Sequence, residues 1–185
     1  WLLEWITPAV VASGRQAASL GPSATTGDAV IVMPEISLGD TSGEFFMVQN
    51  RSRTGNDVLI PADGLLVWHV DATLDGAGYD FLYNNSFTPH KLLRLMEADG
   101  LEEIERGLPA NAGDFYLPGM VFGRATTPSS AGYGGLITDV LVSGIVRSAD
   151  LYSAVLSVGS FRPSAPHNGS IRRATVAGGA SSPSR

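Results

Sequence analysis

The stretch LLVWHVD, from Leu65 to Asp71, decides the fold class of this 185-residue chain. It follows the turn signal PADG and is rich in β-branched and aromatic residues, which is typical of a β-strand. Successive side chains of a strand point to opposite faces. One face of this stretch is entirely apolar, and the other becomes polar at His69 and Asp71. The stretch therefore predicts a strand with two polar side chains at one end.

Further strand signals lie on both sides of this stretch. AVIVM at residues 29–33 and EFFMVQN at residues 44–50 are apolar runs rich in β-branched or aromatic residues. Residues 135–146 and 151–158 flank the polar turn RSAD, and the second run alternates apolar and polar residues. This pattern predicts a β-hairpin near the end of the chain.

Helix signals are few. KLLRLME at residues 91–97 fits both a strand and a helix, whereas LEEIER at residues 101–106 predicts a short helix that ends at Gly107. The chain has 22 glycines and 11 prolines, and only 16% of its residues are charged, against about 25% in an average soluble domain. We therefore expect a mainly β fold: an antiparallel, sandwich-like sheet domain with long Gly-rich loops and at most one or two short helices.

Composition also bounds the domain and its partners. Residues 161–185 are rich in Ser, Pro, Gly and Arg, so we expect one folded unit over residues 1–160 followed by a linker or disordered tail. Residues 1–160 carry eight basic and eighteen acidic side chains, a net charge of −10. Such an acidic body argues against nucleic acid as a partner. No apolar run is long enough to predict a membrane span, and the apolar start at residues 1–6 suggests a piece of a longer protein.

The usual catalytic signatures are missing. The sequence has no cysteine, no HExxH, no GxSxG elbow and no P-loop. His69 and Asp71 share one strand face, where they are candidates for a metal pair or for a base with its orienting carboxylate. The alternative is a half-buried histidine that hydrogen-bonds to a neighbouring loop.

Acidic residues offer a second candidate. Five acids fall between Glu97 and Glu105, and Asp114 lies in a Gly/Asp loop. Ca²⁺ prefers several carboxylate and carbonyl oxygens from such loops, although the spacing matches no EF-hand. A solvated helix face explains Glu102, Glu103 and Glu105 equally well, and a glycosidase-type carboxylate pair remains a further alternative.

Taken in order, several segments resemble a known family, the M6 (immune inhibitor A-like) secreted zinc metallopeptidases. The resemblance covers the region that follows the catalytic core, over about residues 1–159. Gln49 and Phe45 depart from the family pattern, which usually has Glu and Tyr there. The segments that carry the resemblance are WITP at 5–8, GDAV at 27–30, GEFFMVQNR at 43–51, GLLVWHVD at 64–71, EADG at 97–100 and GDFYLPG at 113–119.

The resemblance implies a parent enzyme that hydrolyses peptide bonds with a zinc-activated water. Its HExxH helix and its zinc ligands would lie upstream of Trp1, so this chain should be inactive alone. Its implied partners are that upstream catalytic domain and, through the parent, a protein substrate, and its implied location is extracellular. Because members of this family are calcium-dependent, Asp71, Asp99 and Asp114 are the candidate calcium ligands.

Two other functions stay open at this stage. One is a stand-alone extracellular β-sandwich module that binds carbohydrate or another surface ligand. Trp and Tyr side chains would supply its stacking surfaces, at Trp1, Trp5, Trp68, Tyr79, Tyr83 and Tyr133. The other is an independent hydrolase that uses His69 and acids of the 75–85 loop, and it predicts turnover by the isolated chain.

Overall fold

The computed structural model describes residues 7–32, 42–86 and 88–159, and it is mainly β. A five-stranded sheet has the order β1-β3-β4-β5-β6 and a three-stranded sheet has the order β2-β8-β7. The strands of the larger sheet are β1 (Ala9–Val11), β3 (Ala29–Val32), β4 (Glu44–Arg51), β5 (Gly64–Asp71) and β6 (Leu93–Leu95). Those of the smaller sheet are β2 (Gly14–Leu20), β7 (Val140–Ser148) and β8 (Leu151–Val158). Only β1 and β3 pair in parallel, so the predicted antiparallel, sandwich-like class is confirmed.

Within residues 7–32, 42–86 and 88–159, helical structure is limited to short turns, as expected. The one α-helix in these ranges is α1 (Ser23–Thr26). The 3₁₀ turns are η1 (Gly55–Asp57), η2 (Ile104–Arg106), η3 (Ala112–Asp114) and η4 (Tyr133–Gly135). The helix expected at 101–106 is therefore one 3₁₀ turn, because Glu102 has a φ of 53°, outside the helical region. Gly107 ends that turn in the left-handed conformation.

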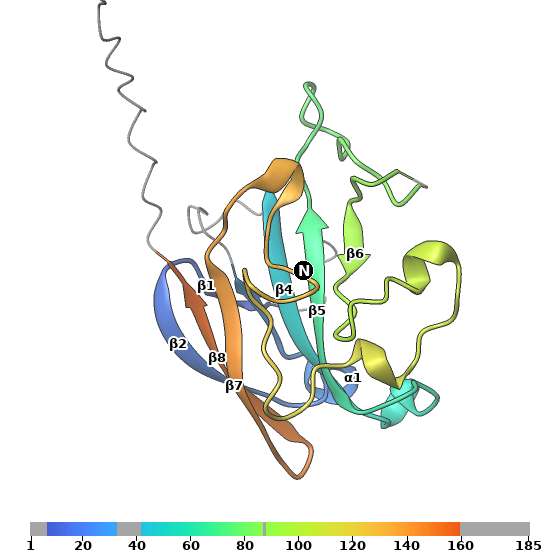
Figure 1. The fold of residues 1–185 in the computed structure, drawn as a ribbon, viewed down its shortest axis with the longest axis vertical. Helices are drawn as coiled ribbons and strands as arrows, with labels where there is room; N and C mark the ends of the chain where they lie inside the picture. Colours follow the sequence, from blue (N-terminus) through green and yellow to red (C-terminus); the bar gives the residue numbers. More distant parts are fainter. Residues whose placement is uncertain (1–6, 33–41, 87, 160–185) are drawn as a thin grey trace, which may run out of the picture.

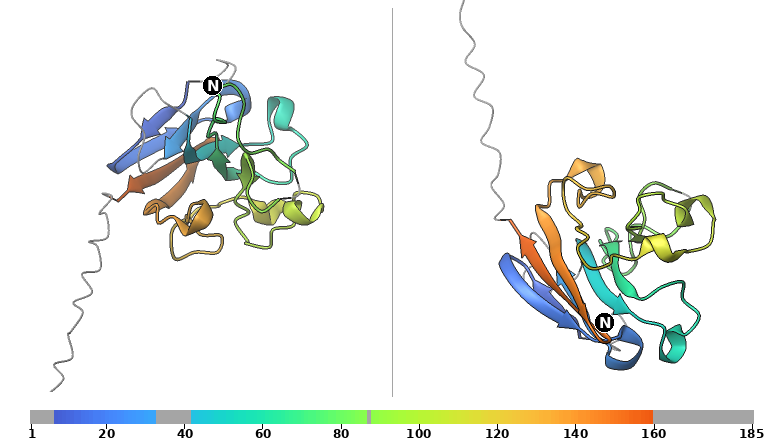
Figure 2. Two further views of the ribbon diagram at one scale, coloured as in Figure 1. Left: turned by 90° about the horizontal axis from the view of Figure 1, so that it is seen from above. Right: turned by 60° about the horizontal axis from the view of Figure 1, so that its bottom comes forward.

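The core lies between the two sheets (Figures 1 and 2). β4 and β5 contribute Val48 and Val67, and the smaller sheet contributes Val142 and Leu156, all with no measurable exposure. Each such side chain stabilises the fold by about 1.5–3 kcal/mol through burial. The alternation predicted for residues 151–158 is confirmed, since every second side chain of β8 is buried. The alternation of apolar and polar residues in β8 therefore arises because one face of this strand packs against the larger sheet.

Asn50, at the end of β4, ties the two sheets together. Its side chain has no measurable exposure. Its Nδ2 donates hydrogen bonds to the Leu20 carbonyl oxygen at 2.9 Å and to the Asp150 carbonyl oxygen at 2.8 Å. The buried Asn50 amide thus fixes the end of β2 and the β7–β8 turn against the larger sheet. The two hydrogen bonds also satisfy both N–H donors of the amide within the core.

The other expected elements are shorter than their sequence patterns. Residues 91–97 contain the strand β6, and the C-terminal hairpin begins at Val140 rather than at 135, because residues 133–135 form η4. The hairpin turn is confined to Ala149 and Asp150. The tail predicted at 161–185 and the apolar start at 1–6 lie outside the described residues.

Long connections hold the functional candidates. The segment that links β5 to β6 and the first part of the β6–β7 segment lie on the side away from β2 (Figure 1, green and yellow-green), whereas the later part of the β6–β7 segment runs beside β7, where Phe122 pairs with Val142. No helix among the described residues has the length and apolar character needed to cross a membrane.

Candidate metal centre

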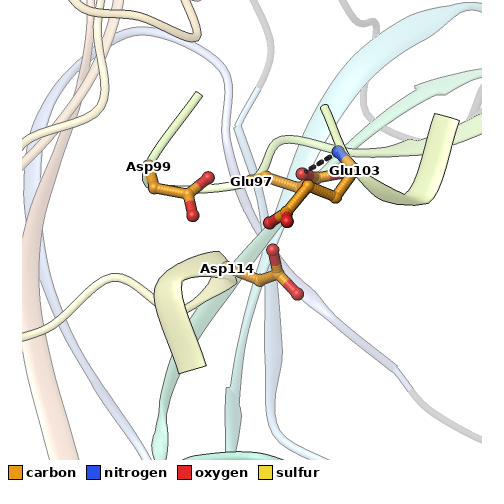
Figure 3. Close-up of side chains that lie close together, drawn as sticks. All are labelled: Glu97, Asp99, Glu103 and Asp114. Carbon is orange, nitrogen blue, oxygen red and sulfur yellow. Dashed lines mark hydrogen bonds between the residues drawn. The ribbon is translucent and has the colours of Figure 1, made fainter. Parts of the chain in front are cut away.

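Four carboxylates converge between the loop after β6 and the turn η3. Glu97, Asp99, Glu103 and Asp114, called here the carboxylate cluster, each offer an oxygen, and these oxygens lie within 4.8 Å of one another. Figure 3 shows the four side chains pointing toward a common centre. Two of the four are strongly buried, since Glu97 is 2% exposed and Asp114 is 1% exposed.

A tight turn after β6 positions the first two acids. The Gly100 N–H donates to the Glu97 carbonyl oxygen at 2.9 Å, and Gly100 adopts a φ of 70° that favours glycine. Asp99 accepts the Leu101 N–H at 3.0 Å, while Glu97 accepts the N–H groups of Glu103 and Ile104 at 2.6 and 2.9 Å. These bonds fold the acidic segment back on itself and bring Glu103 to the cluster.

A capping box at η3 positions the fourth acid. The Asn111 side chain accepts the Gly113 N–H at 2.6 Å, and the Asn111 N–H donates to Asp114 Oδ2 at 2.7 Å. Asn111 Nδ2 also donates to Glu103, which links the two loops. Gly113 is required at its position, because a Cβ there would lie 2.3 Å from Asp99 Oδ2.

One oxygen of the cluster has no hydrogen-bond partner. Asp114 Oδ1 is buried and accepts no hydrogen bond, although the other oxygen of the same carboxylate is in the capping box. Buried polar atoms nearly always have a partner, and leaving a charged one without a partner costs more than leaving a neutral one. A buried, unpartnered carboxylate oxygen beside three other acids is relieved either by protonation or by a bound cation.

Burial and mutual repulsion perturb the acids of the cluster. Burial raises the pKa of Glu97, and the nearby charges of Asp114 and Asp99 raise it further. The hydrogen bonds from the Glu103 and Ile104 N–H groups lower the pKa but do not outweigh these effects. Burial likewise raises the pKa of Asp114, against the hydrogen bond from Asn111, and the charges of Asp99 and Glu103 add to the effect. Both shifts mean that the ionised cluster is unfavourable without a compensating cation.

The donor set fits a hard cation. All four side chains offer oxygen, which Ca²⁺ and Mg²⁺ prefer, whereas structural zinc sites use Cys and His. Oxygens on opposite sides of a Ca²⁺ ion lie roughly 4.6–5.2 Å apart, and those around Mg²⁺ roughly 4.0–4.2 Å. The oxygens of the cluster all lie within 4.8 Å of one another, a spread that can surround an ion of this kind.

The predicted calcium candidates separate into two places. Asp99 and Asp114 meet in the carboxylate cluster, but Asp71 is not among its members. Asp71 ends β5, where it accepts hydrogen bonds from Thr73 and pairs with His90 Nε2 at 2.7 Å. Burial acts to raise the pKa of Asp71, but the hydrogen bonds from Thr73 and His90 prevail and lower it.

His69 does not pair with Asp71, although the two share a strand face. Its Nε2 lies 2.6 Å from Glu44 Oε1, on the adjacent strand β4. The His69 ring stacks on Tyr133 with ring centroids 4.4 Å apart, and Tyr133 stacks on His90 at 3.8 Å. His69 and Asp71 therefore do not form the metal pair or catalytic dyad that the sequence suggested. They belong to two separate pairs, His69 with Glu44 and His90 with Asp71, and the Tyr133 ring stacks between the two histidines.

Two cluster members were not identified as ligands from sequence. The sequence shows Glu97 only as part of an acidic run, and it predicts that Glu103 lies on a solvated helix face. The EADG segment at residues 97–100 carries a usable signal. Gly100 permits the tight turn that directs the side chains of Glu97 and Asp99 toward the same centre. Glu102 and Glu105 instead pair with Arg94 and Lys91 outside the cluster.

The aromatic residues considered for ligand stacking are mostly engaged within the fold. Tyr83 stacks on His90. Trp68 packs against a small apolar cluster of the larger sheet, formed by Ile31, Phe45, Val70 and Ala72. Tyr79, at 88% exposure, is open to solvent. Trp1 and Trp5 lie outside the described residues.

Comparisons of this chain with family models, with curated proteins and with solved structures found no match. A functional proposal therefore rests on the geometry of the carboxylate cluster and on the sequence resemblance described above.

Proposed function

We propose that this chain is a non-catalytic, calcium-binding β-domain of a secreted zinc metallopeptidase of the M6 type. In this proposal, Glu97, Asp99, Glu103 and Asp114 hold one Ca²⁺ ion that fixes the loop after β6 against η3. The parent enzyme's zinc and its ligands would belong to an upstream catalytic domain. The role of the present domain is structural: it packs beside the catalytic domain and becomes rigid when calcium is available.

The buried, unpartnered Asp114 Oδ1 carries the calcium part of this proposal. The oxygen-only donor set supports a hard cation, and the resemblance to a calcium-dependent family supports calcium as that cation. The M6 part is supported by the sequence resemblance alone, and two of its segments, EADG and GDFYLPG, supply Asp99 and Asp114 to the same cluster.

A thermal melt of the full chain in excess calcium and in chelator tests the ion site. Ligand bound only by the folded state stabilises it by about 2.7 kcal/mol at a hundredfold excess over Kd. We expect the midpoint to rise by several degrees with calcium, to rise less with magnesium, and to return to its starting value on chelation. An unchanged midpoint contradicts the calcium site.

Asp114→Asn should abolish most of the calcium-dependent shift, because it removes the charge of the buried ligand while keeping its shape. Asp80→Asn is the matched control, since Asp80 is exposed and lies outside the cluster. Calorimetric titration of both variants with CaCl₂ should show binding only in the control. Equal binding by the two variants would place the ion elsewhere.

The peptidase part is tested separately. The gene should encode an HExxH motif upstream of Trp1, and the isolated chain should not cleave casein even with added Zn²⁺. A signal peptide ending immediately before Trp1, or turnover by the isolated chain, contradicts this part. Neither result would affect the calcium titration.

A further inference from the structure

A recess of about 220 Å³, called here the Trp68 pocket, lies on the outer face of the larger sheet. Trp68 lines it from the face of β5 opposite to Val67, which packs in the core. The loops that hold η1, η2 and η3 lie on the same side of β5 and close the pocket (Figure 1). Its apolar walls are formed by Leu66, Trp68, Leu95, Ile104 and Phe115.

The size and the lining of the Trp68 pocket fit one apolar side chain. A cavity of roughly 150 Å³ lined by Leu, Ile and Phe holds a benzene molecule, so this pocket has room for a side chain as large as Leu or Phe. Two charged residues, Arg51 and Asp114, also line it. Arg51 is already held by Asp57, to which its Nε donates at 2.6 Å. Its guanidinium is therefore not available to select an anionic occupant.

One hydrogen-bond donor of the pocket wall has no acceptor. The indole Nε1 of Trp68 is buried and has no hydrogen-bond partner among the described residues. Buried N–H groups nearly always have an acceptor, because an unpaired one has lost its hydrogen bond to water without replacement. Side-chain movements are common when a partner binds. An occupant that brings a carbonyl oxygen to this wall, and shifts a neighbouring side chain, completes the missing bond.

Exposed apolar side chains continue beyond the pocket. Leu59, which directly precedes the lining residue Ile60, is 93% exposed. Leu101 and Leu108, on the two sides of Ile104 in the sequence, are also exposed. Apolar side chains exposed around a pocket are typical of a surface that binds another molecule. Because the pocket itself holds one side chain, an occupant that also covers its surroundings is a polypeptide rather than a small molecule.

The charge beside the pocket favours a basic polypeptide. Residues 97–114 carry six acidic side chains and one basic side chain, a net charge of −5, or −3 with one Ca²⁺ bound. Asp114, from this acidic stretch, lines the pocket directly. Opposite charges across an interface promote association, whereas like charges oppose it. The pocket therefore matches an apolar side chain that has Lys or Arg next to it.

We propose that the Trp68 pocket binds a basic peptide segment of another protein, which inserts one side chain of the size of Leu or Phe. The main-chain carbonyl next to this anchor accepts the hydrogen bond of Trp68 Nε1, and the flanking basic side chains lie against the acidic residues 97–114. A few buried anchors of this kind supply most of the affinity in protein interfaces. This inference rests neither on the proposed calcium site nor on the proposed peptidase parent.

Titration of the full chain with the peptide Ac-Lys-Leu-Lys-NH₂ at low salt, in calcium and in chelator, tests the proposal. We expect it to bind at least about tenfold more tightly than Ac-Lys-Ser-Lys-NH₂, which lacks the anchor. It should also bind several-fold more tightly than Ac-Glu-Leu-Glu-NH₂, which reverses the charge. Calorimetry measures the affinities. The indole N–H resonance of Trp68, assigned with Trp68→Phe, should shift only with the first peptide.

Ala110→Phe blocks the pocket without changing the core, because Ala110 lines the pocket and is exposed. We expect it to weaken binding of Ac-Lys-Leu-Lys-NH₂ at least about tenfold. Ala125→Phe is the matched control, since Ala125 is exposed and is not a lining residue of the pocket. Both variants should respond to calcium in a thermal melt as the unchanged chain does. This comparison separates a blocked pocket from a damaged carboxylate cluster.

Four results would overturn the proposal. The first is no binding of the leucine peptide up to about 10 mM in either calcium or chelator. The second is equal affinity for the leucine and serine peptides, which would indicate attraction by charge alone. The third is equal affinity of the Ala110→Phe and Ala125→Phe variants. The fourth is binding of N-acetyl-leucinamide as tight as that of Ac-Lys-Leu-Lys-NH₂, which would identify a small apolar ligand instead of a basic peptide.

Discussion

At the scale of single residues, the chemistry of the cluster depends on how each carboxylate is held. Asp114 has one oxygen in a capping box and one that is buried without a partner. Glu97 accepts two backbone N–H groups, and yet its pKa is raised, because burial and its acidic neighbours outweigh those bonds. The fold thus keeps acids close together in a place where their ionised forms repel one another, and either a proton or a bound cation relieves that repulsion.

Gly113→Ala is the sharpest single-residue test of this packing. The added Cβ would lie 2.3 Å from Asp99 Oδ2 and 2.9 Å from Asn111 Oδ1, so Asp99 has to move out of the cluster. We expect the calcium-dependent rise in melting midpoint to shrink strongly and calcium affinity to fall at least tenfold, or about 1.4 kcal/mol. Calorimetric titration measures the affinity.

Gly43→Ala is the control for that change. A Cβ at Gly43 meets no atom within 4 Å, and this glycine does not adopt a left-handed conformation. Its calcium affinity should equal that of the unchanged chain. Full affinity in Gly113→Ala would show that Asp99 is not needed as a ligand.

At the scale of elements, two long loops are fastened to the ends of β4 and β5 by stacked rings. Tyr133, in η4, lies between His69 of β5 and His90 of the loop before β6. Each histidine pairs with a carboxylate, at Glu44 and Asp71, and these two acids are directly opposite each other across the β4–β5 ladder. The same end of the sheet therefore anchors the loops on both sides of the tyrosine ring.

Tyr133→Ala should loosen both loops at once. Removing the ring takes away two stacking contacts, worth roughly 0.5–1.5 kcal/mol each beyond the burial of the ring itself. We expect a loss of about 2–3 kcal/mol in the free energy of unfolding and faster proteolysis within residues 74–91 and 123–137. Urea unfolding and timed proteolysis with mass spectrometry measure the two effects.

Tyr133→Phe separates the ring from its hydroxyl. The phenylalanine ring keeps both stacks and loses only the 3.2 Å hydrogen bond from the Lys91 N–H. Its proteolysis pattern should match that of the unchanged chain. If both variants behave alike, the hydroxyl rather than the stack holds the loops.

At the scale of the whole molecule, the raised pKa values of Glu97 and Asp114 link stability to pH. A carboxyl whose folded pKa is above its unfolded value takes up its proton at higher pH in the folded state. The resulting cost to stability is fully present above the folded pKa and disappears as the pH falls to the unfolded value, near 4. The lowered pKa of Asp71 acts in the opposite sense, and its stabilisation is lost only as the pH falls below that value.

We therefore expect the calcium-free protein to become more stable as the pH is lowered from neutral toward 5, while the stabilisation by calcium decreases over the same range. Protons and calcium compete for Glu97 and Asp114, so both trends have one cause. Thermal melts in calcium and in chelator across this range measure both. A calcium increment that stays constant with pH would mean that these two acids do not bind the ion. Asp114→Asn should reduce the dependence of the calcium-free melting midpoint on pH.

Local patterns in the sequence located the strands β3, β4, β5, β7 and β8, whereas no such pattern marked β1 and β2. The period of two in residues 151–158 determined which side chains of β8 face the core, but nearly every residue of β5 is buried, on both faces of the strand. Compositional signals likewise determined the mainly β class and the long loops. Element ends were less well determined, because the φ angle of Glu102 and the turn η4 depend on contacts outside their own segments.

Only the tertiary structure decided the candidate site. Glu103 and Asp114 belong to separate loops, and the bond from Asn111 that joins them has no local signature in the sequence. His69 pairs with Glu44, its diagonal neighbour on β4, whereas Asp71 pairs with His90 from the loop before β6, and the sequence pattern of β5 alone specifies neither partner. The sequence by itself therefore determined the mainly β class, most of the strands and the acidic character of the loops, whereas the tertiary fold determined which acids meet, because their contacts join segments that no local pattern relates.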